Sequence, residues 1–284
     1  MSKRNITSLS IVDIKINIIK KMYFYIPIIL ITIIYCISAY NKYSFYRDIN
    51  EIRSDMSLGH YFSYLWKGEM IFSHDVSDKT VKIPAFITFF FLYNGFLICR
   101  YLNIKRSFSM GNFYLKSSSN FMWHISKLIW CTISTLLLFG IFFLCTFVFA
   151  LFSGSISLDT SDDIIQCLLG SDYPALQANF GQLVLMPFLV LISTAFIQVF
   201  LSLLLSPIIA YTMLIIYYVS SLFLCKSSFI YNYVILLRSD VYDSNGVSYN
   251  DGIILNAVLV LLIFITYVLI SKVTANHTLT LIRH

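Results

Sequence analysis

Long apolar stretches separated by polar connections dominate the pattern of this chain. Six of them reach the length that a helix needs to cross a bilayer, about 20 mainly apolar residues and at least ~17. None of the six contains Asp, Glu, Lys or Arg, in keeping with the high cost of a charge at bilayer depth. The pattern predicts an all-α integral membrane protein, one transmembrane domain over residues 1–284, with spans at residues 22–39, 83–99, 128–152, 183–205, 208–224 and 253–270.

Two amphipathic segments accompany the spans. Residues 6–21 place Ile11, Ile14 and Ile18 on one helical stripe, which predicts an interfacial helix, although the alternation within residues 13–18 also fits a strand. Residues 104–116 predict a short helix that is apolar on one side and basic around it. Residues 117–120 then supply candidate N-caps for a new helix that begins near Phe121.

The remaining connections predict smaller features. Residues 40–82 are too long and aromatic for a bare linker, so we expect short helices on the outer surface there, with Trp66 at headgroup depth. A short helix is expected near residues 163–169. The break at Ser206-Pro207 divides some forty apolar residues and predicts a tight turn between two spans.

Composition and charge agree with a membrane protein and add an orientation. Hydrophobic residues make up 58% of the chain and charged residues 12%, with a mean hydropathy of +0.78. Residues 1–21, 100–127 and 271–284 hold twelve of the twenty basic residues and one of the fourteen acidic ones. The positive-inside rule therefore places both termini and the loop of residues 100–127 in the cytoplasm, and residues 40–82 outside.

Several kinds of chemistry are missing from the sequence. The net charge of +6 reflects topology, since no Lys/Arg-rich run of the kind that tracks nucleic acid is present. No G-x-x-x-x-G-K-[ST] run occurs, so no P-loop binds ATP on this chain. H-E-x-x-H and G-x-S-x-G are also absent, and we expect no catalytic residues, no metal site and no bound cofactor.

A few polar residues and thiols remain as candidates. Asn94, Gln198 and Asn256 lie inside predicted spans, where they either join helices through hydrogen bonds of about 1 kcal/mol or line a transit path. Cys167 and Cys225 are predicted at the outer face, where an oxidising environment permits a disulfide, and the alternative is two separate thiols.

The order of these features resembles ABC-2 type transporter permease subunits, particularly the small ones of low-GC Gram-positive bacteria. The shared marks are an N-terminal interfacial helix, six spans with both ends inside, and a basic amphipathic segment that leads into a long third span. The passages that carry the resemblance are L-x-S-x-S at residues 115–119, W-x-x-S-K at residues 123–127, Ser57-Leu58-Gly59-His60-Tyr61, and Ile83-Pro84.

The resemblance implies a transport subunit of the bacterial cytoplasmic membrane and not an enzyme. It would work by alternating access with a second permease chain, identical or different, while separate P-loop ATPase subunits bind ATP and Mg²⁺. The segment at residues 104–116 would be the coupling helix that inserts in a groove of the ATPase. Its implied anchors are Phe108, Met110, Phe113, Tyr114 and Leu115, with Arg106 and Lys116 as rim charges.

Family habit makes an exported amphipathic or antimicrobial peptide, or a lipid-like compound, the expected cargo. Other interpretations stay open. The basic loop is also compatible with a surface segment held by anionic lipid. The whole chain is compatible with a membrane sensor or assembly protein that transports nothing, or with a transporter or channel that needs no ATP.

Overall fold

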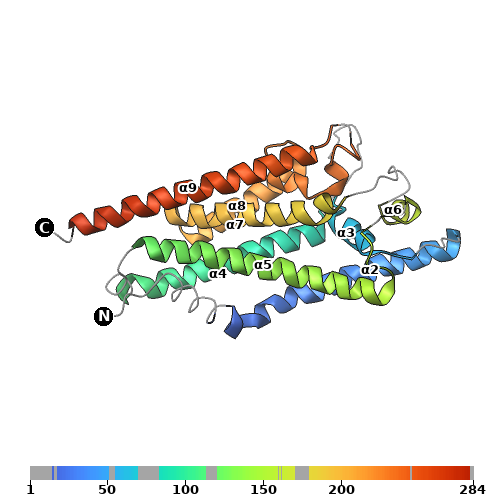
Figure 1. Cartoon of the computed structure of the whole chain (residues 1–284), viewed down its shortest axis with the longest axis horizontal. Coiled ribbons are helices and arrows are strands. Elements are labelled where there is room, and N and C mark those ends of the chain that lie inside the picture. The colour runs from blue at the N-terminus through green and yellow to red at the C-terminus, as the bar shows by residue number, and fades with distance from the viewer. Residues whose placement is uncertain are drawn as a thin grey trace.

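The structure is a computed structural model that describes residues 15, 18–50, 55–69, 83–112, 120–158, 160, 162–169, 179–243 and 245–281 (Figure 1). Within these ranges every regular element is helical. The only β-type pairings there are two isolated parallel bridges, Ser57 with Ser155 and Ser239 with Val247. The predicted all-α class is therefore confirmed for the part of the chain that is described.

Five helices are long and apolar enough to cross a membrane: α2 (Ile26–Asn50), α4 (Ala85–Asn112), α5 (Asn120–Ser153), α7 (Met186–Leu204) and α9 (Tyr249–Leu281). The 3₁₀ turn η1 (Ile19–Tyr25) precedes α2, and the π-helical turn η2 (Gly181–Leu185) precedes α7. The predicted fifth span corresponds to α8 (Pro207–Phe223), an apolar helix of 17 residues. At 1.5 Å per residue α8 is ~26 Å long, so its crossing of the membrane stays a prediction.

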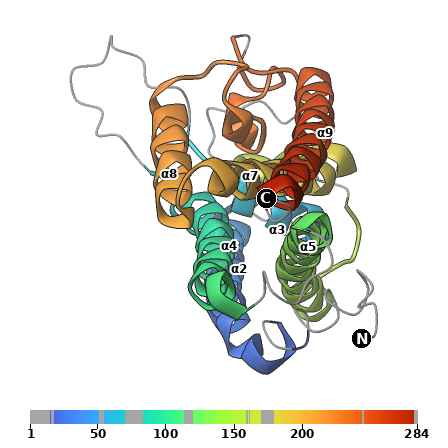
Figure 2. The same cartoon turned by 90° about the vertical axis from the view of Figure 1, so that its left-hand side faces the viewer.

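Helix α7 lies at the centre of the bundle. It packs against α4, α5, α8 and α9, which surround it when the bundle is viewed from one end (Figure 2). Helix α2 lies on the outside against α5. Of the five long apolar helices, α9 and α2 are the least buried within the protein. Large apolar side chains on them, such as Ile254 and Leu30, are more than half exposed. Such wide apolar surfaces are rare on soluble proteins and suit contact with lipid.

The two ends of the bundle differ. At one end, which we call the basic end, α4 finishes at Asn112, α5 begins at Asn120 and α9 finishes (left in Figure 1). The other end, which we call the loop end, carries the short helices α3 (Leu58–Trp66) and α6 (Asp162–Leu169). It also holds the connection from α8 to α9, with the 3₁₀ turns η3 (Ile230–Tyr233) and η4 (Leu236–Arg238).

The local predictions between spans hold in three places. Helix α6 confirms the short helix near residues 163–169, and α5 begins within one residue of the predicted start at Phe121. The turn at Ser206-Pro207 is also confirmed. The backbone N–H of Ile209 donates to Ser206 Oγ at 3.2 Å, and Pro207 occupies the first helical turn, where its missing N–H costs little.

Two predictions differ from the structure. The short helix expected within residues 40–82 is present as α3, but it is not laid on the outer surface: Trp66 is fully buried, with Phe86, Phe90 and Phe142 at ring-centroid distances of 5.5, 5.5 and 5.2 Å, and its depth relative to the headgroups stays a prediction. Eight of the nine residues of α3 are buried, because α3 is inserted between α5, α6 and α4. The segment at residues 104–112 is not a separate helix, because α4 runs through it without a break.

The N-terminal interfacial helix predicted at residues 6–21 lies mostly outside the described residues. Of that segment, Lys15 is helical, Ile18 precedes η1, and residues 19–21 are the first residues of η1. A kink at Lys21, with φ −124° and ψ 27°, interrupts the helical backbone between the two parts of η1.

Residues 56–59 and 154–157 form a clamp that joins the start of α3 to the end of α5. The backbone N–H groups of Leu58 and Gly59 donate to the carbonyls of Ser155 and Ser157 at 3.0 and 3.2 Å, and the Ser155 N–H donates to Met56 at 3.1 Å. This close approach requires glycine. A Cβ on Gly154 would collide with the Met56 carbonyl.

We expect Gly154→Ala to destabilise the protein by about 1–3 kcal/mol, since the new methyl group forces the clamp apart. Gly140→Ala is the matched control in α5, because a Cβ there meets nothing within 4 Å and alanine is the better helix former. Thermal unfolding in detergent should show a lower midpoint for Gly154→Ala and an unchanged or higher one for Gly140→Ala. Equal midpoints for the two variants would contradict this account of the clamp.

Candidate functional site

Two of the three polar residues in the middle of the bundle take part in contacts between helices. Asn94, Gln198 and Asn256 are at most 1% exposed. Gln198 Nε2 donates to the Gly95 carbonyl at 2.8 Å and so joins α7 to α4, while Thr135 Oγ1 of α5 lies 3.5 Å from Asn94 Oδ1. Asn256 Nδ2 donates to the carbonyl of Gly252 within α9 at 2.9 Å. The structure therefore groups Asn94 with Gln198 and leaves Asn256 apart.

Among the described residues, only a small cavity adjoins Asn94 and Gln198. The cavity lined by Asn94, Gly95, Gln198 and Tyr211 measures about 10 Å³, at the lower limit of the space that one water occupies. The Tyr211 hydroxyl donates to the Leu92 carbonyl at 3.0 Å, which adds a second link to α4 from α8. Gln198 Oε1 and Asn256 Oδ1 are buried and have no hydrogen-bond partner among the described residues.

At the loop end, a buried arginine closes the end of α8. Arg238 is 2% exposed. Its Nη1 donates to the Ser221 carbonyl at 2.5 Å and to Asn232 Oδ1 at 2.7 Å, its Nη2 to the Leu222 carbonyl at 2.8 Å, and its Nε to the Glu69 carbonyl at 3.1 Å. Burial lowers the pKa of the guanidinium, which still stays charged at the negative end of the α8 dipole. Arg238 therefore has a structural role.

Arg238→Met should destabilise the protein by about 2 kcal/mol or more. Loss of the guanidinium leaves the Ser221 and Leu222 carbonyls and Asn232 Oδ1 buried without these donors. Each buried acceptor without a donor costs about 1–3 kcal/mol of stability. Lys226→Met removes the same charge from an exposed site in the same connection and should change little. Unfolding midpoints in detergent measure both variants. Equal effects would mean that the charge matters and the hydrogen bonds do not.

The two cysteines at the loop end do not form a disulfide. Cys167 lies in α6 and Cys225 follows α8, and the structure has both as thiols. Burial raises the pKa of the Cys225 thiol, so it is less reactive than an exposed cysteine. The disulfide between Cys167 and Cys225 that the sequence allowed is therefore not present.

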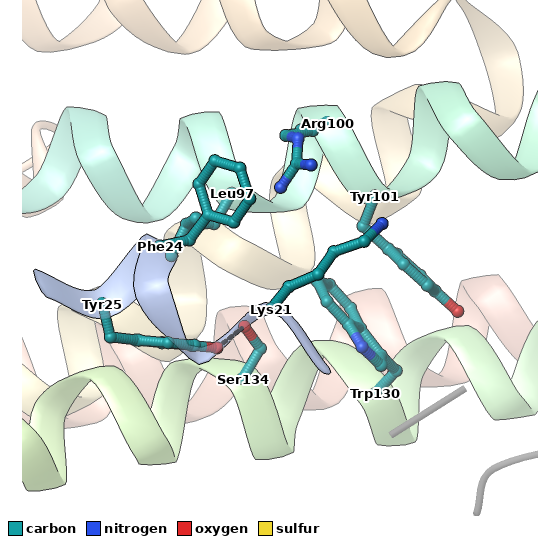
Figure 3. A pocket seen from close by; sticks show the side chains of 8 residues that line it. All are labelled: Lys21, Phe24, Tyr25, Leu97, Arg100, Tyr101, Trp130 and Ser134. Atoms are coloured by element: carbon teal, nitrogen blue, oxygen red, sulfur yellow. Dashed lines mark hydrogen bonds between the residues drawn. The ribbon is translucent and has the colours of Figure 1, made fainter. Parts of the chain in front are cut away.

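At the basic end, η1, α4 and α5 enclose a pocket with two cations on its wall (Figure 3). The Arg100 guanidinium lies 3.5 Å from the centroid of the Phe24 ring, and Figure 3 shows the Lys21 side chain running toward Tyr101. The Tyr25 hydroxyl and Ser134 Oγ are 2.9 Å apart and join η1 to α5. The lining residues are Lys21, Phe24, Tyr25, Leu97, Arg100, Tyr101, Trp130 and Ser134.

A third cation supports this pocket from behind. Lys127 is 2% exposed, its Nζ donates to the Tyr101 hydroxyl at 3.0 Å, and it lies 4.4 Å from the centroid of the Tyr101 ring. Tyr101 in turn stacks on Trp130 at a centroid distance of 3.5 Å. The Trp130 indole N–H is buried and has no hydrogen-bond partner among the described residues.

The sequence analysis missed this pocket, because it treated Lys21, Arg100 and Lys127 only as signals of topology. A local signal was available. Each of the three cations lies within three residues of an aromatic side chain that shares the pocket, namely Phe24, Tyr101 and Trp130. The three segments are far apart in the chain, so the sequence did not show that they meet.

The predicted coupling residues fall almost entirely outside what is described. Arg106, Phe108 and Met110 belong to the helical backbone of α4, but their side chains are outside the described part of the structure. Phe113, Tyr114, Leu115 and Lys116 lie in residues 113–119, which are outside it altogether. Their role in binding an ATPase stays a prediction.

No family model, curated protein or solved structure matches this chain. Among the described residues, no group of three or more His, Cys, Asp or Glu side chains could hold a metal ion.

Proposed function

We propose that this chain is the permease subunit of an ATP-driven exporter. It would form a translocation path with a second permease chain, identical or different, in the cytoplasmic membrane of a bacterium. Separate P-loop ATPase subunits would supply the energy. The cargo would be an amphipathic or antimicrobial peptide or a lipid-like compound, as the family resemblance implies.

The continuation of α4 and α5 beyond their uncharged apolar runs carries this proposal. The uncharged run of α4 ends at Cys99, yet the helix continues past Arg100 to Asn112, or ~20 Å. Helix α5 begins at Asn120, ahead of Lys127 and of the uncharged run that starts at Leu128. Both projections lie at the basic end, which the positive-inside rule assigns to the cytoplasm, the compartment that contains ATP.

The continuity of α4 gives the projection a mechanical use. One unbroken helix joins the tip to Gly95, whose carbonyl accepts the hydrogen bond from Gln198 of α7. A displacement of the tip by an ATPase would therefore move the α4–α7 contact at the centre of the bundle. Transport would require a second arrangement in which the small cavity beside Asn94 and Gln198 opens.

Co-purification with the P-loop ATPases encoded by neighbouring genes tests the proposal. Phe113→Asp together with Leu115→Asp should reduce the captured ATPase and ATP-dependent transport at least tenfold, because apolar anchors of such contacts are worth about 2 kcal/mol or more. Ser117→Asp together with Ser119→Asp adds the same charge to the same loop, removes no anchor, and should retain both.

Two outcomes would contradict the proposal. If the wild-type chain captures none of these ATPases, the sensor or assembly interpretation is favoured. If it conducts solute in proteoliposomes that contain no ATPase and no ATP, it is a channel or an independent transporter. Membrane levels of each variant, measured on the same samples, separate a lost contact from a lost fold.

A further inference from the structure

We propose that the cavity between α4, α7, α8 and η3 holds one ordered water molecule, bound by the side-chain oxygen of Gln198. The cavity volume of about 10 Å³ corresponds to a single water. Gln198 lines this cavity and is fully buried, and its Oε1 has no hydrogen-bond partner among the described residues. A water supplies the donor that this oxygen lacks. The assignment is independent of whether the chain belongs to an exporter.

The other contact of the Gln198 amide fixes which of its two ends is left without a partner. Nε2 donates to the Gly95 carbonyl at 2.8 Å. Exchange of the nitrogen and the oxygen would set Oε1 against that carbonyl, and two acceptors repel. A Cβ on Gly95 would lie 3.3 Å from Oε1 and 2.9 Å from the Tyr211 ring, and all three residues line the cavity. Oε1 is therefore an acceptor on the cavity wall.

The hydrogen bonds around the cavity leave acceptors in excess. The Tyr211 hydroxyl donates to the Leu92 carbonyl at 3.0 Å, and Thr194 Oγ1 donates to the Leu191 carbonyl at 2.9 Å. These donors are therefore engaged by the backbone, while the Tyr211 oxygen keeps lone pairs that can accept. A water carries two donors, so it can serve Gln198 Oε1 and Tyr211 together. It would thus add a link between α7 and α8.

The lining favours water over an ion or an apolar ligand. Its polar groups are the neutral amides and hydroxyls of Asn94, Thr194, Gln198, Tyr211 and Tyr231, and it includes no Asp or Glu. Nothing on the wall therefore balances the charge of a cation among the membrane-spanning helices. An apolar ligand would leave the Gln198 oxygen buried without a donor, which is unfavourable. A buried water needs at least two polar partners, and this wall supplies them.

Radiolytic footprinting of the purified full-length protein in detergent tests this assignment. A synchrotron X-ray pulse turns bound water into hydroxyl radicals, which oxidise the side chains that the water touches, and mass spectrometry measures the oxidation rates. Tyr231 lines the cavity and Tyr267 does not, while the two are 2% and 1% exposed. Tyr231 should oxidise at least about threefold faster than Tyr267, since only Tyr231 lies beside the proposed water. Equal rates would mean a dry cavity and would overturn the proposal.

Two variants should remove the water by different routes. Gln198→Met keeps an unbranched side chain and loses the amide, whereas Gly95→Ala keeps the amide and narrows the cavity. Each should lower the Tyr231 rate to that of Tyr267, and an unchanged Tyr267 rate reports an intact fold. Asn256→Leu is the matched control, because it removes a buried amide that does not line this cavity and should leave the Tyr231 rate unchanged.

Two further results would overturn the proposal. A Tyr231 rate that stays high in Gln198→Met, with Tyr267 still protected, would mean that Gln198 does not hold the water. A saturable rise of the unfolding midpoint with sodium chloride, absent with choline chloride and lost in Gln198→Met, would assign the cavity to a sodium ion instead.

Discussion

The absence of water from the hydrocarbon core of a bilayer constrains this structure more than any single contact. Backbone groups must pair within the protein at that depth, and charges must leave it. The described spans meet the first condition by being helical. Few polar side chains lie in the middle of the bundle. Two of them, Gln198 and Tyr211, donate hydrogen bonds to the backbone carbonyls of Gly95 and Leu92.

The two ends of the bundle meet the same constraint in different ways. The loop end is closed, because α3 is buried, the clamp joins α3 to α5, and Arg238 satisfies the last carbonyls of α8. The basic end has cations, no acid in the adjacent helices, and a buried N–H without a hydrogen-bond partner among the described residues. One end is therefore closed by contacts within the chain, and the ATPase contact that we propose lies at the other end, at the tip of α4.

Much of the fold could be predicted from the sequence because apolar length, capping residues and charge act locally. The helix boundaries at Ser206-Pro207, near Phe121 and at α6 followed from such signals. The burial of Trp66 was not predicted, because aromatic residues suit both a headgroup layer and a packed core, and only the neighbouring elements decide between them. The continuity of α4 was missed although no Gly or Pro interrupts residues 96–110.

The candidate sites were less predictable, because they depend on contacts between distant segments. Gln198 and Gly95 were each visible in the sequence, but their hydrogen bond was not. The pocket requires Lys21, Arg100 and Trp130 to meet, and no spacing within one helix encodes that meeting. Cys167 and Cys225 illustrate the converse, since a shared predicted face did not bring the two thiols into a disulfide.

The sidedness of the basic end is the most direct test, since both the ATPase contact and the direction of coupling depend on it. In a Cys167→Ser, Cys225→Ser background, Asn112→Cys marks the tip of α4 and Asn245→Cys marks the connection between α8 and α9. With an impermeant maleimide, Asn245→Cys should react in intact cells, and Asn112→Cys only in inverted membrane vesicles. Reaction of Asn112→Cys in intact cells, with Asn245→Cys protected, would place the basic end outside and contradict the account.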